Sequence, residues 1–182
     1  MVKSVDWKAL RKTATYTVEG QDVTYRKRGT PRLLDKIARN KVLGDAIQHL
    51  IGSSLKSKAS TVDALKDAVA AAAEDSGLDA GKVLRELVTS VPTIVIEILV
   101  EDTVLASEDE RADYRDWVEQ LGPSGLVDAI TGWVDLNMPE FRAPLVRALA
   151  AVLQQGGAIL SAVQAAARGQ TAGDAIEAAK AA

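Results

Sequence analysis

The sequence contains no cysteine and a single histidine, His49. Without thiols, the protein can form no disulfide, zinc–thiolate centre or cysteine nucleophile. One imidazole also leaves little scope for histidine-based catalysis or a multi-histidine metal site. The first twenty residues hold no apolar run typical of a secretory signal. We therefore expect a cytoplasmic protein with no cofactor, no bound metal and no enzymatic activity.

Aromatic residues are also scarce, at 4% of the 182 residues, whereas 30 residues are alanine and 47% are hydrophobic. Alanine is the best helix former, and its small side chain lets helices approach closely. The composition predicts a mainly α fold, a multi-helix bundle with aliphatic contacts in its core.

A β-hairpin is predicted near the N-terminus, because apolar and polar residues alternate over 14–18 and again over 23–27. Tyr16 and Val18 share one strand face, as do Val23 and Tyr25. An isolated hairpin is marginally stable in water. We expect this one to be packed on the first long helix, which follows it.

That helix is predicted to begin at Thr30 and Pro31 and to stop at Gly52, ahead of a serine-rich linker at 53–60. The chain is therefore divided into a basic hairpin-plus-helix lobe (1–58), a helical core (59–168) and an alanine-rich, mobile tail (169–182).

Glycine, proline and capping residues punctuate the rest of the chain into further predicted helices. One runs from Ser60 to just before Gly77, and another from Asp79 to about Thr89. A separate, highly apolar helix from Ser90 and Pro92 to Leu105 is expected at the centre of the fold. The remaining predicted helices are one that holds Tyr114 and Trp117 and stops at Gly122, one over 123–136, and one that begins at Pro139.

Positive charge is concentrated at the start of the chain. Residues 1–41 hold eleven Lys/Arg against four Asp/Glu, a net charge of +7, and the remainder carries −10. Such a patch could bind a protein partner, or the phosphates of a nucleic acid with Tyr16 and Tyr25 stacking on bases. It could also meet the acidic stretch 97–119 of another copy in a salt-sensitive ring or spiral, or pair with that stretch in its own chain. The candidate basic residues are Arg26, Lys27, Arg28, Arg32, Lys36 and Arg39.

Two smaller features are compatible with chemistry but favour an ordinary explanation. Glu97 and Glu101 lie four residues apart, yet no histidine accompanies them as in di-metal helix motifs, so we expect a solvated polar stripe. His49 follows Asp45 by four residues, the spacing of a common side-chain pair on a helix.

An apolar heptad pattern runs through the last predicted helix. Its spacing alternates between four and three residues, which is typical of a helix that packs along another. That other helix could belong to a partner or to the protein's own core, and the pair Gly156–Gly157 would either break the helix or permit a close approach. A membrane span over 148–167 is not expected, since glutamines and glycines interrupt it. The candidate contacts are Leu145, Leu149, Val152, Ile159 and Val163.

The order of motifs between residues 84 and 153 resembles the tail assembly chaperones of long-tailed bacteriophages. That family pairs a Pro-x-x-Val-x-Glu-Ile helix with a later Leu-Pro … Leu-x-Ala-Ile helix. Here the first motif is Pro92-Thr93-Ile94-Val95-Ile96-Glu97-Ile98, followed by Leu121-Gly122-Pro123 and by Leu126 to Ile130, with Gly122 inserted between the leucine and the proline.

The resemblance implies a small, mainly helical, non-enzymatic protein of the host bacterial cytoplasm. Such a protein would bind the long helical tape measure protein, keep it soluble while the tail tube assembles, and be absent from the mature virion. It implies no individual site residues. Two other interpretations stay open: a small nucleic-acid-binding regulator that uses the basic residues of 25–41, and a structural subunit of a phage tail or head.

Overall fold

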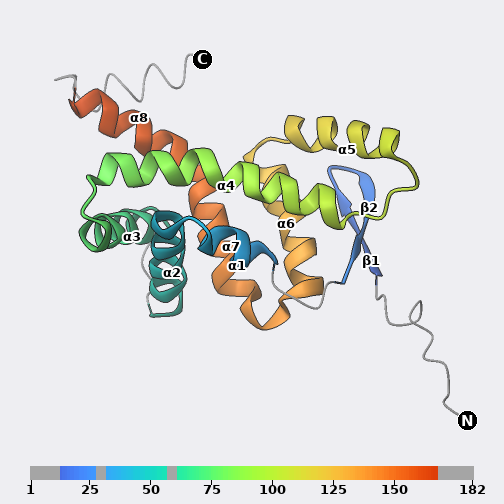
Figure 1. Cartoon of the computed structure of the whole chain (residues 1–182), viewed down its shortest axis with the longest axis horizontal. Helices are drawn as coiled ribbons and strands as arrows, with labels where there is room; N and C mark the ends of the chain where they lie inside the picture. Colours follow the sequence, from blue (N-terminus) through green and yellow to red (C-terminus); the bar gives the residue numbers. More distant parts are fainter. Residues whose placement is uncertain (1–12, 28–31, 57–60, 168–182) are drawn as a thin grey trace, which may run out of the picture.

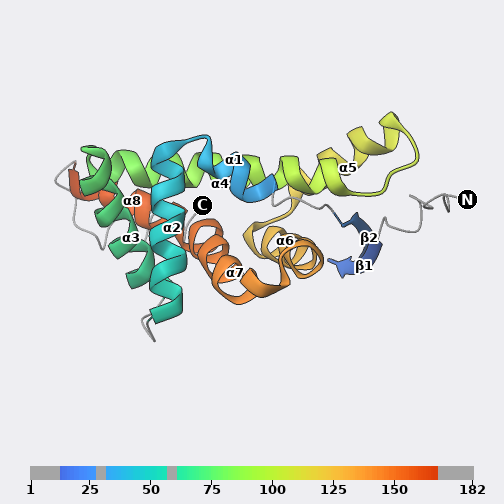
Figure 2. The ribbon, with the colours of Figure 1, turned by 60° about the horizontal axis from the view of Figure 1, so that its bottom comes forward.

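The computed structural model of the protein describes residues 13–27, 32–56 and 61–167, and in it α4 runs along the length of the molecule (Figures 1 and 2). The helices α2, α3 and α8 lie around one end of α4, and the hairpin, α5 and α6 lie around the other. The elements are β1 (Thr13–Val18), β2 (Gln21–Arg26), α1 (Arg32–Ala38), α2 (Lys41–Lys56), α3 (Thr61–Ser76), α4 (Ala80–Asp102), α5 (Glu108–Gln120), α6 (Pro123–Asn137), the 3-10 turn η1 (Pro139–Phe141), α7 (Arg142–Ala150), the π-helical turn η2 (Ala151–Gln155) and α8 (Gly156–Ala167).

The predicted mainly α fold with a small N-terminal hairpin is confirmed. The two strands pair antiparallel, with Tyr16 opposite Val23. A two-residue turn joins them, and both of its residues, Glu19 and Gly20, have positive φ (47° and 81°). Such a turn matches the right-handed twist of the strands. As predicted, Val18, Val23 and Tyr25 are buried on one face of the hairpin.

The support beneath the hairpin differs from the prediction. Its strands pack on α6 and on the C-terminal end of α4 instead of on the helix that follows them. Gly132 of α6 permits this approach, because a Cβ atom there would lie 2.7 Å from Cγ of Tyr16. The missing side chain on α6 thus makes room for the Tyr16 ring.

Polar contacts hold the hairpin and α6 to the C-terminal end of α4. The backbone N–H of Val104 donates to the carbonyl of Thr24 (2.8 Å), which extends the strand pairing beyond the helix. Beneath this contact, the indole Nε1 of Trp133 donates to Oδ2 of the fully buried Asp102 (3.0 Å). Burial also raises the pKa of Tyr25 well above its ordinary value, so its phenol stays neutral. The junction is therefore held by directed hydrogen bonds, of which the one between Trp133 and Asp102 is buried.

The helix predicted from Thr30 to Gly52 proves to be two helices, α1 and α2. The chain turns at Arg39 and Asn40, where Oδ1 of Asn40 accepts a hydrogen bond from the backbone N–H of Leu43 (3.2 Å). Asparagine is a favoured N-cap residue, and this bond gives α2 its own beginning. Gly52 does not stop α2, which continues to Lys56 because the glycine keeps a helical backbone.

The two helices predicted on either side of Ser90 prove to be one continuous helix, α4. Ser90 does not cap a new helix; its hydroxyl donates to Oε1 of Glu86 one turn earlier (3.0 Å). Pro92 stands inside the helix. An interior proline removes one backbone hydrogen bond, but Val91 and Val95 on either side of it are fully buried. Core packing therefore outweighs the local break signal.

The other predicted helices are confirmed, with changes near the C-terminal end. The helices before Gly77 and from Pro123 agree with α3 and α6, and the helix that holds Tyr114 and Trp117 is α5, which already begins at Glu108. Pro139 opens a 3-10 turn rather than the helix itself, and α7, η2 and α8 then follow without a gap. Gly156 allows the close approach considered in the sequence analysis, because a Cβ atom there would lie 2.7 Å from Cγ2 of Val88 on α4.

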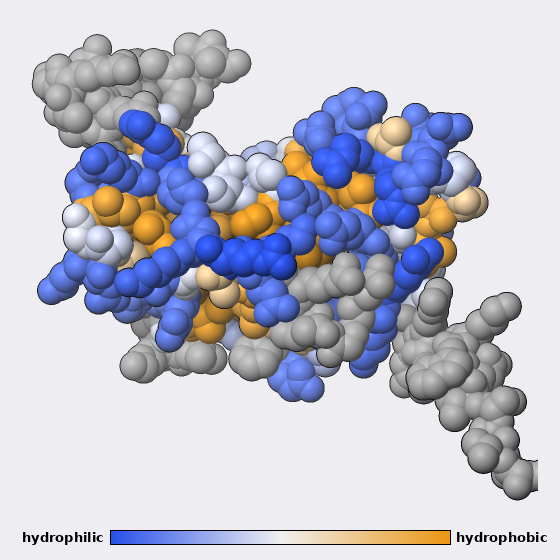
Figure 3. Space-filling model, viewed as in Figure 1, coloured by the Kyte–Doolittle hydropathy of each residue, from blue (hydrophilic) through white to orange (hydrophobic). Residues whose placement is uncertain are grey.

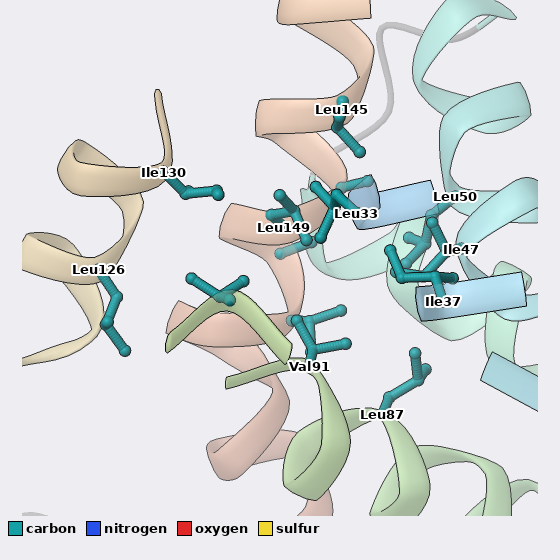
Figure 4. Close-up of a cluster of buried hydrophobic side chains, with 14 of the residues drawn as sticks. Leu33, Ile37, Ile47, Leu50, Leu87, Val91, Leu126, Ile130, Leu145 and Leu149 are labelled. Atoms are coloured by element: carbon teal, nitrogen blue, oxygen red, sulfur yellow. The ribbon is translucent and has the colours of Figure 1, made fainter. Parts of the chain in front are cut away.

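One aliphatic core joins the parts of the chain before and after residue 58. Side chains from α1, α2, α4, α6 and α7 converge in it, with Leu33 and Leu149 near its middle (Figure 4). Moreover, α2 packs against α3, α4 and α7. The predicted boundary at residue 58 therefore does not separate two cores, because the parts of the chain before and after it share one. The predicted tail, 169–182, lies outside the described residues.

The faces of α4 can be tested with two neighbouring substitutions. Ile98 is fully buried, so Ile98→Ala should lower the free energy of unfolding by about 2–5 kcal/mol. Glu97→Ala removes only a partly exposed ion pair and should cost less than about 1 kcal/mol. Urea unfolding of both variants measures the difference. Equal losses would contradict the assignment of faces.

The hairpin contact can be tested at Gly132. Gly132→Ala places a methyl group against the Tyr16 ring and should destabilise the protein by about 1–3 kcal/mol. Gly157 is a matched control, because a Cβ atom there meets no other group within 4 Å. Gly157→Ala should stabilise the helix by about 0.5–1 kcal/mol. Thermal unfolding would show the assignment to be wrong if the two alanines shifted the melting temperature in the same direction.

Candidate partner-binding surfaces

The predicted basic residues do not form a single free patch. Arg26 is half-buried at the end of β2, Lys27 beside it is exposed, and Arg39 is exposed in the turn between α1 and α2. Arg28 lies outside the described residues, and the side chain of Arg32, at the start of α1, is not described. The described members therefore lie in two separate places, around the end of β2 and around α1.

Lys36 forms ion pairs within the protein. Its ammonium group donates to Oε2 of Glu97 (2.7 Å) and to Oε1 of Glu101 (3.0 Å), both on α4. The stripe of Glu97 and Glu101 was expected to be solvated, yet it receives a lysine from a segment more than sixty residues earlier. The structure therefore shows Lys36 paired within its own protomer.

A second polar contact holds the same region to α4. Nδ2 of Asn40 donates to Oε1 of Glu86 (2.6 Å), while Oδ1 of Asn40 caps α2. Together, Lys36 and Asn40 fix α1 and the start of α2 along the polar side of α4.

The nucleic-acid interpretation loses Tyr25 as a stacking residue, whereas Tyr16 is half-buried. Tyr25 is fully buried, and Tyr16 packs against it with ring centroids 5.9 Å apart. A base can stack only on an accessible aromatic face.

His49 does not pair with Asp45 as predicted. Its Nε2 lies 2.8 Å from Oδ2 of Asp75, and this contact links α2 to α3.

The heptad residues are mostly core residues. Leu145, Leu149 and Val152 are buried, which agrees with the alternative that this helix packs within its own protein. Ile159 is half-buried, and the side chain of Val163 is not described. The first three side chains therefore lie in the core and are not available to a partner in this structure.

The helical run that contains these residues has a second notable property. Arg142–Ala162 is the one run in the described ranges that is long and apolar enough to cross a membrane by length and composition. A core helix passes the same test; Leu145 and Leu149 are buried, and about 33% of the apolar window as a whole is buried in this structure.

Two apolar grooves remain open between helices, and the sequence analysis did not predict either. The first, of about 400 Å³, lies between α1 and α2, in a region where Figure 3 shows apolar surface in the lower middle of this face. The second, of about 190 Å³, lies between α3, α4 and α8, and Ile159 forms part of its wall. The first is lined by Leu34, Ile37, Ala38, Lys41, Gly44, Asp45, Ile47, Gln48 and Ile51, and the second by Leu65, Lys66, Val69, Ala80, Leu84 and Ile159.

No cluster of metal-ligating side chains occurs among the residues that the structure describes. Comparisons of the chain with protein-family models, with curated proteins and with solved structures find no match.

The ion pair of Lys36 predicts a pH dependence. Burial alone would lower the pKa of Lys36, but the hydrogen bonds to Glu97 and Glu101 outweigh it and raise the pKa above the ordinary value. A raised folded-state pKa means that the pair stabilises the protein below the ordinary lysine pKa of about 10.4 and ceases to do so as the pH rises through the folded-state value.

Lys36→Met should therefore be less stable than wild type by up to about 1 kcal/mol at neutral pH, after discounting for solvent screening. The gap should close as the pH rises from the ordinary lysine pKa of about 10.4 through the raised folded-state pKa of Lys36. Urea unfolding across this pH range measures it, with Lys66→Met, an exposed lysine on α3, as the control. A gap that stayed constant with pH would rule out the ion pair as its cause.

Proposed function

We propose that the protein is a bacteriophage tail assembly chaperone, which binds the helical tape measure protein and keeps it soluble during tail assembly. The observation that carries this proposal is the pair of open apolar grooves between helices. An amphipathic helix can bury its apolar face in such a groove.

The motif residues support the proposal through the fold rather than through a site. Val95 and Ile98 on α4 and Ile130 on α6 are fully buried, and α4 packs against α6. The motif residues that carry the resemblance lie in the core of this protein, so contacts with a client must come from other residues. The two grooves are apolar surfaces of described residues that can supply such contacts.

The charge pattern adds a proposal about assembly. The exposed acids of α5, Glu108, Asp109 and Glu110 among them, could meet Lys27 and Arg39 of another copy. A head-to-tail contact of this kind builds rings or spirals and weakens as salt screens the charges.

Co-expression tests the proposed function. The tape measure protein from the same genome should be insoluble when expressed alone and should become soluble and co-purify with this chain. The matched control is Ile98→Ala, whose weakened core should reduce the amount of soluble client in proportion to its loss of folded protein. If the tape measure protein stays insoluble in the presence of well-folded wild-type chain, the proposal is wrong. If the chain is found in purified virions, a structural subunit is favoured instead.

A further inference from the structure

We infer that the groove between α1 and α2 is a docking site for an amphipathic helix that carries a lysine or arginine beside its apolar face. This assignment adds the place and the chemistry of client binding, and as such it rests on the proposed function.

The groove has an apolar floor and a polar edge. Ile37 and Ile47 form the floor and are almost fully buried in the core, while Leu34 and Ile51 are half-buried and form the walls. Gly44 adds no side chain, which leaves the groove open where α1 meets α2. Apolar side chains at helical spacing from a partner can therefore reach the floor.

Asp45 supplies the charge complementarity. Its Oδ2 atom is shielded from water and accepts no hydrogen bond within the described part of the chain. Lys41, one turn earlier on α2, forms no ion pair with it among the described residues. The Asp45 side chain is half-buried in the lining of the groove and forms no ion pair among the described residues. A cation on the incoming helix can pair with its charge, whereas an acidic or purely apolar partner cannot.

The groove is also fixed in shape before binding. Lys36 and Asn40 bind α1 and the start of α2 to the carboxylates of α4. A preformed groove loses little conformational entropy when a partner enters it. The groove between α3, α4 and α8 has a lysine, Lys66, as its one charged lining residue, so it does not share this preference for a cation.

A designed helical peptide tests the assignment on the full chain. It carries leucines at i, i+3, i+4 and i+7 and one lysine beside that stripe, and its twin carries glutamate in place of the lysine. Fluorescence anisotropy should show the lysine peptide binding wild type about tenfold more tightly than its twin. Asp45→Lys should reverse this preference, while Asp67→Lys on the exposed side of α3 should leave it unchanged.

A steric variant and a cross-link place the peptide independently of charge. Ala38→Phe fills the groove and should abolish binding, whereas Ala112→Phe, at an exposed alanine of α5, should not. Because the chain has no cysteine, Gln48→Cys gives a single attachment point for a photo-cross-linker at the groove, and Glu119→Cys gives the control on α5. The peptide should cross-link to the first and not to the second.

The outcomes separate this inference from the proposed function. The groove assignment is overturned if wild type does not bind the lysine peptide, if Asp45→Lys leaves the preference unchanged, or if both cysteine positions cross-link equally. Those results leave the co-expression result as it stands. Peptide binding at the groove together with an insoluble tape measure protein would keep the docking site and reject that client.

Discussion

The packing of α4 is the constraint on which the rest of the structure depends. Its apolar side chains reach the core that α1, α2, α6 and α7 share, and its other side carries the carboxylates of Glu86, Glu97 and Glu101. Those carboxylates receive Lys36 and Asn40 and so fix α1 in place. At its C-terminal end, Asp102 accepts the indole N–H of Trp133 and the adjoining chain extends the hairpin. One helix thus positions elements that lie far from it in the sequence.

The fold class could be predicted because the sequence signals for it are local. The alternation over 14–18 and 23–27 identified the hairpin, and Gly77, Asp79 and Pro123 marked real helix ends. The errors occurred where tertiary contacts outweighed local signals. Pro92 and Gly52 were both interpreted as helix breaks. Burial of Val91 and Val95 keeps α4 continuous through Pro92, and a helical backbone at Gly52 keeps α2 continuous. Asn40 was the opposite case, a genuine cap within a run of apolar residues that suggested one long helix.

The candidate site could be predicted only in part, since a surface depends on which faces the fold leaves open. The heptad spacing of Leu145, Leu149 and Val152 was real, but spacing alone does not distinguish the protein's own core from a partner. The pairing of Lys36 with Glu97 and Glu101 joins residues more than sixty positions apart, and no local pattern predicts it. The groove between α1 and α2 exists because of the turn at Asn40. Asn40 as an N-cap residue was the one signal in the sequence from which this groove could have been predicted.

The π-helical turn at Ala151–Gln155 changes which neighbours the last helical run can contact. A π turn is an α-helix with one residue inserted, and each residue rotates the helix by about 100°. Accordingly, α7 packs on α2 and α6, whereas α8 packs on α4, although no break separates them. The single residue inserted in this turn therefore sets the direction in which Ile159 points from α8. Insertions or deletions of one residue in this turn are a route by which related sequences can redirect α8 while the core around α7 stays the same.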